Sequence, residues 1–321
     1  MISVKHLTKT YKSHKRQSNI LKDVFFRTFT DHVAVKDISL EIESGELVGF
    51  IGPNGAGKTT TLKMLAGILY PTSGTISVLG HNPFDKKRDF LKQIAFIMGQ
   101  RNQLVWDLPA VDSFELQSAV YEIDPHEYKQ TLAHLLDILD CEPLTQKPVK
   151  TLSLGERMKM ELIAGLLHRP KLIFMDEPTI GLDIFSQEAI RLFIKEYQQK
   201  YKSTIILTSH YLEDVKKLAK RLVVIHQGTI MYDGSLRDII EKYSTEKQIK
   251  VTLEEEVSEA KIHSIGIPIS AVYPQLIFSV KRNEIPEKIK QIVQTLPFSD
   301  LTVEEASIEE VIKSFFGRQS S

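Results

Sequence analysis

The stretch Gly52-Pro53-Asn54-Gly55-Ala56-Gly57-Lys58-Thr59-Thr60 decides the fold of the core, because it predicts a phosphate-binding loop. It follows the apolar run 47–51, which suits a buried strand, and it precedes residues 61–65, which suit a helix. The loop fits the pattern G-x-x-x-x-G-K-[ST], in which glycines let backbone N–H groups wrap a phosphate. The dipole of the following helix favours the same anion. A purely structural glycine-rich turn is the alternative, and the strand and helix on either side argue against it.

Two carboxylates supply the second half of such a site. The apolar residues 172–175 end in Asp176 and Glu177, and the carboxyl ends of parallel strands meet at the ligand edge of a sheet. We expect Lys58 to reach the β- and γ-phosphates of a nucleoside triphosphate. We expect Thr59 and Asp176 to hold Mg²⁺, and Glu177 to activate the attacking water. An acidic pair at a helix start is the alternative, which the loop at residue 52 argues against.

Composition narrows the class of protein. The 321 residues carry 41 Lys+Arg and 41 Asp+Glu, so no net charge steers the chain to nucleic acid or to a membrane surface. The single cysteine, Cys141, cannot form an internal disulfide, which fits a reducing compartment. Met1 leads directly into a strand-like segment, which predicts no signal peptide. No uncharged apolar run approaches the roughly 18 residues of a membrane span, so another chain would provide any membrane part.

Apolar runs predict an α/β core with a parallel sheet. A helical pattern, broken by prolines, occupies about 108–168 as an insertion between sheet elements. A helix is expected from about 234 to 243, and a small α+β domain with its own core over about 245–317. We therefore divide the chain into residues 1–243 and 245–321. The predicted strands of the first part are 1–10, 33–42, 47–51, 75–79, 94–98, 172–175, 204–208 and 222–225.

The segment 12–32 separates two of these strands. It begins basic, and Ile20 and Val24 would share one face of a helix that extends to about Phe29. Such a helix could lie on anionic lipid or on a partner. Because the segment is short and also carries Asp23 and Asp31, packing on its own domain is the preferred interpretation.

A second anion site is indicated before residue 157. Ser153 could cap the helix that follows, with Glu156 completing a capping box. A serine, the amide of Gly155 and a free helix N-terminus can also bind an anion. Both roles are compatible, and both stay open at this point.

The order of these features resembles the ATP-binding subunits of ATP-binding cassette (ABC) transporters over about residues 1–243. That resemblance implies a phosphate-loop core with a parallel sheet, an antiparallel β subdomain and a helical insertion. It also implies ATP and Mg²⁺ as cofactors. The motifs that carry the resemblance are Gly52–Thr60, Gln100, Leu152–Glu156, Asp176-Glu177, Gly181-Leu182-Asp183 and Ser209-His210.

Further roles come from the resemblance alone. It implies that Tyr11 stacks on adenine, and that Gln100 contacts Mg²⁺ and the attacking water. His210 would contact the γ-phosphate and hold Glu177 and the water. Gln93 and Gln103 compete with Gln100, which is preferred because it follows the strand 94–98 after one glycine. Structural roles are the alternative for Tyr11, as a strand-end aromatic, and for His210.

The resemblance also places Ser153 and Gly155 on the γ-phosphate held by an opposite subunit, and Asp183 at the seam. The family pattern is Leu-Ser-Gly-Gly-Gln, whereas this chain has Leu154 and Glu156 at the third and fifth positions. Leu154 leaves the Gly155 amide free, and Glu156 can still accept hydrogen bonds from ribose hydroxyls. The long spacing between Tyr11 and the phosphate loop at Gly52 is a second departure from the family pattern. The apolar loop 104–109 suits a partner's helix or an anchor of the insertion to the sheet.

These features predict an ATPase subunit that is cytoplasmic, peripheral at the inner face of the cell membrane, and without a nucleic-acid partner. Two copies, or one copy and a related cassette, would close around two ATP and drive a separate membrane-spanning subunit. Three features look most like those of ATPase subunits that serve bacterial drug or polysaccharide exporters: the segment 12–32, the 152–156 motif and the residue pattern Thr179–Asp183. An importer subunit is the alternative, and a soluble ABC ATPase on ribosomes or DNA is a second one. The C-terminal domain could regulate, dimerise or stabilise.

Overall fold

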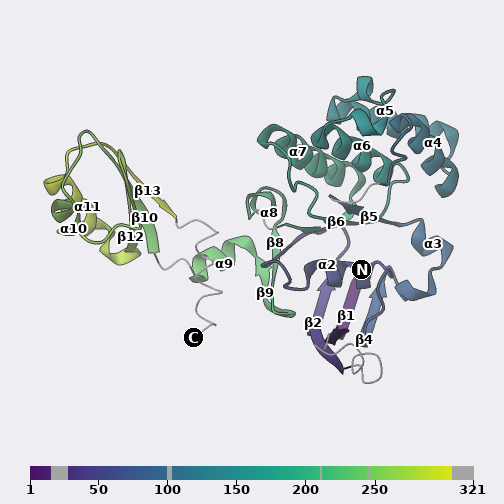
Figure 1. The fold of residues 1–321 in the computed structure, drawn as a ribbon, viewed down its shortest axis with the longest axis horizontal. Helices are drawn as coiled ribbons and strands as arrows, with labels where there is room; N and C mark the ends of the chain where they lie inside the picture. Colours follow the sequence, from purple (N-terminus) through teal and green to yellow (C-terminus); the bar gives the residue numbers. More distant parts are fainter. Residues whose placement is uncertain (16–27, 100–102, 210–211, 244–245, 306–321) are drawn as a thin grey trace. The chain divides into compact units, whose positions relative to one another are not determined.

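The computed structural model describes the chain except for residues 16–27, 100–102, 210–211, 244–245 and 306–321. It divides into two compact units, Met1–Gly234 and Ser235–Ser321, and Figure 1 shows the ribbon of both. No described helix is long and apolar enough to cross a membrane.

The first unit contains a six-stranded sheet and a three-stranded antiparallel sheet. The parallel core sheet and an antiparallel subdomain were predicted, whereas the strand at Thr229–Ser235 was not. The six-stranded sheet has the order β5-β6-β7-β3-β8-β9, and its central strands pair in parallel. The strands of this sheet are β3 (Leu47–Ile51), β5 (Ile94–Met98), β6 (Leu172–Asp176), β7 (Thr204–Thr208), β8 (Arg221–His226) and β9 (Thr229–Ser235). The smaller sheet has the order β2-β1-β4 and consists of β1 (Ile2–Lys15), β2 (Thr28–Ile42) and β4 (Ser73–Val78).

Helices cover one face of the six-stranded sheet (Figure 1). Along β6, the alternate residues Ile173 and Met175 enter the core beneath the helices, whereas Leu172 and Phe174 enter the core shared with the small sheet. Because both faces are buried, the strand is apolar throughout. The helices are α2 (Lys58–Leu65), α3 (Arg88–Leu91), α4 (Ala110–Tyr121), α5 (Pro125–Leu139), α6 (Leu154–Leu166), α7 (Ile184–Tyr201) and α8 (Leu212–Leu218).

The segment around residues 12–32 differs from the prediction. Strand β1 does not end before Tyr11 but continues to Lys15, and it pairs with β2 from Thr28 onward. The helix expected over about 20–29 falls mostly on residues outside the described part, and its last two positions are strand. Tyr11 is cross-strand partner to His32. At the two described positions of the expected helix, Thr28 and Phe29, pairing with β1 replaces the helical pattern.

The second unit has the element order β-α-β-β-α-β after an initial helix. Its antiparallel sheet has the order β11-β12-β10-β13, which is that of the split β-α-β fold. Buried residues of β10, β12 and α11 form its own core, as predicted, whereas α10, β11 and β13 were not predicted. The pattern Ser307-Ile308-Glu309-Glu310 predicts a capping box before a helix over 311–316, and these positions lie outside the described residues. The elements are α9 (Leu236–Tyr243), β10 (Glu246–Leu253), α10 (Glu259–His263), β11 (Ser270–Val272), β12 (Gln275–Lys281), α11 (Ile285–Thr295) and β13 (Phe298–Glu305).

Candidate functional site

The loop Gly52–Thr60 joins β3 to α2, as the sequence predicts. At Gly57, which precedes the first residue of α2, φ is +106°, and a Cβ atom would lie 2.5 Å from the carbonyl oxygen of Ala34. At Gly52, a Cβ atom would lie 2.1 Å from the carbonyl oxygen of Ile225. Both glycines are therefore required by the close approach of neighbouring backbone. At Gly55, φ is +79° and the space is open, so only the backbone conformation favours glycine there.

Lys58 folds back onto the loop that precedes it. Its ammonium group donates to the carbonyl oxygens of Gly52 at 2.6 Å and of Pro53 at 3.1 Å, and the residue is 5% exposed. Burial lowers the pKa of Lys58, and the charges of Glu177 and Asp176 partly oppose that shift. The amine thus points at the centre of the loop, where it can exchange carbonyl oxygens for phosphate oxygens.

Asp176 joins the loop to two neighbouring strands. Its Oδ1 atom accepts from the hydroxyl of Thr59 at 2.9 Å and from the hydroxyl of Thr208 at 2.7 Å. Thr59 lies in the first turn of α2, Asp176 ends β6 and Thr208 ends β7, so the three meet at the carboxyl edge of the sheet. A carboxylate and a hydroxyl oxygen are hard donors, which suits Mg²⁺ completed by phosphate oxygens and water. The residues present therefore fit this metal.

Glu177 is held by the end of β7. Its backbone N–H donates to both the carbonyl and the hydroxyl oxygen of Thr208, each at 3.1 Å. Its φ is +53°, a left-handed conformation that is uncommon for a residue with a side chain. Gly99 packs against this turn, because a Cβ atom there would lie 2.3 Å from the carbonyl oxygen of Glu177. Such a strained turn persists only where the surroundings hold it, as they do here.

An open cavity of about 470 Å³ covers the loop. Tyr11, at 38% exposed, contributes to its wall, and so does Glu177. The sequence alone did not single out three further lining residues, His32, Ala34 and Ile180. The cross-strand pairing of His32 with Tyr11 is the signal that places His32 there, and it depends on the register of β1 and β2. The size of the cavity lies within the usual range for small-molecule sites.

Ser153, Gly155 and Glu156 lie at the start of α6 and do not line this cavity within one chain. The predicted capping box is present: Ser153 N–H donates to Glu156 Oε2 at 2.8 Å, and Glu156 N–H donates to Ser153 Oγ at 3.2 Å. The hydrogen bonds from the backbone and side chain of Ser153 lower the pKa of Glu156. The Glu156 carboxylate therefore already has a structural role, which the ribose contact would have to share.

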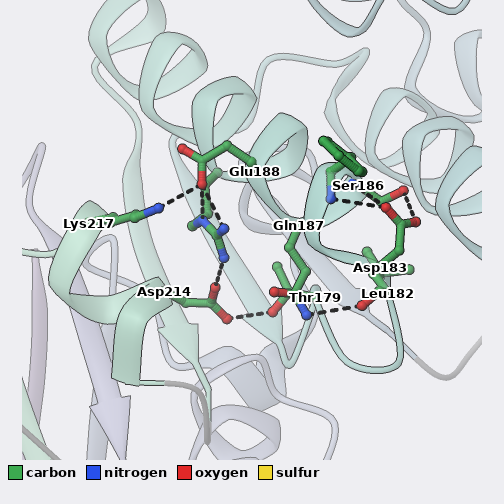
Figure 2. A network of polar contacts seen from close by, with 10 residues as sticks. Thr179, Leu182, Asp183, Ser186, Gln187, Glu188, Asp214 and Lys217 are labelled. Carbon is green, nitrogen blue, oxygen red and sulfur yellow. Dashed lines mark hydrogen bonds and ion pairs between the residues drawn. The ribbon is translucent and has the colours of Figure 1, made fainter. Parts of the chain in front are cut away.

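Asp183 caps α7 next to this motif. It accepts from the N–H groups of Phe185 and Ser186 at 3.0 Å each and from Ser186 Oγ at 2.6 Å (Figure 2). Gly155 packs against the same turn, because a Cβ atom there would lie 2.3 Å from Ser186 Oγ. The 152–156 motif and Asp183 are thus joined through Ser186.

Two predicted site residues, Gln100 and His210, lie outside the described residues. Their competitors have other partners: the Gln103 side chain donates to the Phe96 carbonyl at 3.0 Å, and that of Gln93 to the Asp89 carbonyl at 2.7 Å. Neither Gln103 nor Gln93 lines the cavity that includes Lys58.

The apolar loop 104–109 is both anchored and exposed. Leu104 is buried, and the N–H of Val105 donates to Ser113 Oγ at 3.0 Å. Trp106 remains 45% exposed beside the guanidinium group of Arg157. A groove of about 450 Å³ adjoins this loop at Gln103, and its other lining residues come from the segment after α2 and from α3, β5, α4 and α6. The structure is therefore compatible with both interpretations of the loop, contact with a partner's helix and anchoring of the helical insertion to the sheet.

Comparison with known proteins finds matches to residues of both units. A family model described as "ABC transporter" matches residues 35–180, and one described as "EvrA-like ABC transporter, C-terminal domain" matches residues 245–304. The chain is 35% identical over 213 residues to the ABC transporter ATP-binding protein NatA of Bacillus subtilis. The matched region covers 66% of this chain and 86% of that protein.

Two further relatives have lower sequence identity. The bacitracin transport ATP-binding protein BcrA of Bacillus licheniformis is 28% identical, over 88% of this chain and 92% of its own length. The Nod factor export ATP-binding protein I of Cupriavidus metallidurans is 31% identical, over 67% of this chain and 70% of its own. The dimeric cassette MJ0796 bound to ADP and Pi shares the fold, with a TM-score of 0.60 at 23% identity over 74% of this chain and 99% of that one.

Proposed function

Because the chain belongs to the ABC transporter ATP-binding proteins, we propose that Glu177, Lys58 and the Thr59–Asp176 pair hydrolyse its ATP between two closed subunits. Within that family, the chain is the ATPase subunit that powers transport. The observation that carries the proposal is the shared contact of Thr59 and Thr208 with one oxygen of Asp176. This contact supports the proposal because it brings the phosphate loop, the carboxylate of Asp176 and the turn of Glu177 to one edge of the sheet.

The proposed mechanism gives each residue of the site one role. The N–H groups of the loop and the ammonium group of Lys58 bind the β- and γ-phosphates. Thr59 and Asp176 hold Mg²⁺, which when bound neutralises charge on the β- and γ-phosphate oxygens. Glu177 accepts a proton from the water that attacks the γ-phosphorus, and its strained turn holds the carboxylate in place. Gln100 and His210 complete this set, and Tyr11 stacks on adenine.

A second copy supplies the remaining contacts. Ser153 and Gly155 lie away from the cavity above Lys58 within one chain, so they would serve the nucleotide of a partner. Next to Asp183, Ile184 and Phe185 are 77% and 88% exposed, which is unusual for large apolar side chains. A partner subunit that closes over this face would cover them. We therefore propose a dimer, of identical or related cassettes, around two ATP.

The membrane partner is a separate spanning subunit, and the chain works at the inner face of the membrane. The exposed apolar residues of the loop 104–109 and the neighbouring groove supply a contact surface for it. Export is the proposed direction, because the 152–156 motif resembles exporter subunits and one relative is named for Nod factor export.

The Glu177→Gln variant tests the proposal. It should bind ATP normally, lose turnover, and accumulate as an ATP-bound dimer in size-exclusion chromatography with light scattering. Glu196→Gln, which changes an exposed carboxylate on α7, is the matched control and should behave as the wild type. Normal turnover of Glu177→Gln would refute the assignment. Purification from detergent-solubilised membranes should recover a polytopic partner, and recovery of ribosomes or DNA instead would refute the transport role.

A further inference from the structure

The carboxylate of Asp214 is buried among donors from three separate segments. Its Oδ2 atom accepts from the hydroxyl of Thr179 at 2.5 Å and from the hydroxyl of Ser209 at 2.9 Å. Its Oδ1 atom accepts from Nη1 of Arg191 at 2.6 Å. Figure 2 shows Asp214 on α8 between Thr179 and the helix α7 that carries Glu188. One side chain thus joins the turn after β6, the end of β7 and the middle of α7.

This ion pair has little access to solvent. The side chains of Asp214 and Arg191 are 1% and 7% exposed, and Thr179 and Ser209 are each 1% exposed. A second layer completes the pair: Glu188 accepts from Arg191 at 2.7 Å and from Lys217 at 2.8 Å, and both Glu188 and Lys217 are more than 40% exposed. Because desolvating a charged pair is expensive, a buried pair is weak evidence of stabilisation by itself. The position of its partners suggests another use.

Each segment that Asp214 holds leads to the proposed site. Thr179 comes two residues after Glu177. Ser209 directly follows Thr208, whose hydroxyl contacts Asp176 and the N–H of Glu177. Arg191 lies eight residues after Asp183, which is about two helical turns along a rigid rod. The first turn of α7 is the face that the proposed second copy covers.

We propose that Asp214 is a positioning residue for ATP hydrolysis, which through Arg191 and Thr179 couples the Asp183 end of α7 to the turn that carries Glu177. This inference rests on the proposed function. When a second copy closes on residues 183–186, a shift of α7 reaches Asp214 through Arg191 and moves the Glu177 turn with it. Ser209 links the same carboxylate to the segment that continues into His210. Hydrolysis thereby depends on closure at α7 as well as on nucleotide binding.

The sharpest test separates positioning from folding. Asp214→Asn and Arg191→Met each break the pair and could lower stability, whereas the double variant Arg191→Met/Asp214→Leu removes both charges and should regain folding stability. In steady-state kinetics, normalised to ATP bound per chain, we expect kcat of the double variant to stay on the order of 10- to 100-fold below the wild type. KM for ATP should change less than about threefold, because the binding loop is untouched.

Matched variants refine this result. Thr179→Val, which removes the hydroxyl, should lower kcat in the same way, and Thr179→Ser, which keeps it, should restore kcat. Lys217→Gln, at the exposed end of the same network, should keep wild-type kcat. A double variant that regains both stability and kcat would show that the pair only stabilises the fold and would overturn the inference.

The proposed function is checked in the same assay. A wild-type chain without ATP turnover would overturn the proposed function and this inference together. A wild-type chain that hydrolyses ATP, with Glu177→Gln inactive and the double variant at normal kcat, would overturn the inference alone.

Discussion

The hydroxyl group of Thr59 lies 2.9 Å from Oδ1 of Asp176, although 117 positions separate the two residues in the chain. The same oxygen accepts from Thr208 at 2.7 Å, so one carboxylate joins the ends of α2, β6 and β7. Because β6 and β7 are parallel neighbours in the sheet, this contact follows from their register, which pairs Asp176 with Thr208. This contact therefore holds the phosphate loop and the carboxylate turn together at one edge of the sheet.

The Asp176→Asn variant should weaken binding of Mg²⁺–ATP but leave binding of metal-free ATP nearly unchanged. Loss of a charged ligand should cost about 10-fold in affinity, the equivalent of one charge-assisted hydrogen bond. Titration with a fluorescent ATP analogue, in Mg²⁺ and then in EDTA, measures both affinities. Asp300→Asn, an exposed position of β13, is the control. Equal weakening with and without Mg²⁺ would contradict the metal role of Asp176.

Neighbouring positions of the 152–156 motif should respond differently to mutation. Gly155→Ala should lower the free energy of unfolding by about 1–3 kcal/mol, because its Cβ atom would lie 2.3 Å from Ser186 Oγ. Leu154→Ala should cost less, since Leu154 is 39% exposed. Urea unfolding followed by the fluorescence of Trp106 reports on the first unit. If Gly155→Ala unfolds like the wild type, the turn of Ser186 can yield, and the packing argument fails.

Stability of the first unit should fall as the pH falls below about 6.5. Burial lowers the pKa of His168 to about 4, against a weaker opposing hydrogen bond with the carbonyl of Ile94. Above the unfolded pKa of about 6.5, both states are neutral and the native contacts of His168 contribute fully. As the pH falls from about 6.5 toward 4, only the unfolded state binds the proton, so stability is lost.

The expected loss from His168 is about 2 kcal/mol between pH 7.5 and pH 5. Urea unfolding at both pH values should show a smaller difference for His168→Gln than for the wild type. His126→Gln, at an exposed position of α5, should leave the difference unchanged. An identical pH dependence in His168→Gln and wild type would show that His168 does not titrate in this way.

The Cys141 thiol should be inert in the folded chain. It is 1% exposed, and burial raises its pKa to about 11, so little thiolate forms at pH 8. Labelling with an aromatic disulfide reagent should therefore proceed only as fast as the first unit opens, and at once in denaturing urea. Because Cys141 is the only cysteine, the signal has one source. Fast labelling without denaturant would mean that the α5–α6 region opens locally.

Local patterns predicted most of the first unit. The glycine pattern of Gly52–Thr60 identifies the loop, and the runs at β5, β6 and β7 are identified as strands because they are short, apolar and bounded by turns. The capping box at Ser153 was predicted for the same reason, since its two hydrogen bonds are local. The extension of β1 beyond Tyr11 was missed, because strand pairing with β2 is a long-range interaction that the helical pattern of residues 20–29 does not reveal.

By itself, the sequence determined the order of the motifs, the phosphate loop, the carboxylates at the end of β6 and the family to which the chain belongs. These are properties of residue type and spacing. Only the tertiary structure decided that Thr59 and Thr208 share one oxygen of Asp176, that Gly155 leaves room for Ser186, and that Asp214 pairs with Arg191. Each of these contacts joins different segments of the chain, and it exists because packing and strand register bring those segments together. The residues of the phosphate loop are thus enough to predict it, whereas the proposed coupling of Glu177 to α7 depends on contacts that form only in the folded chain.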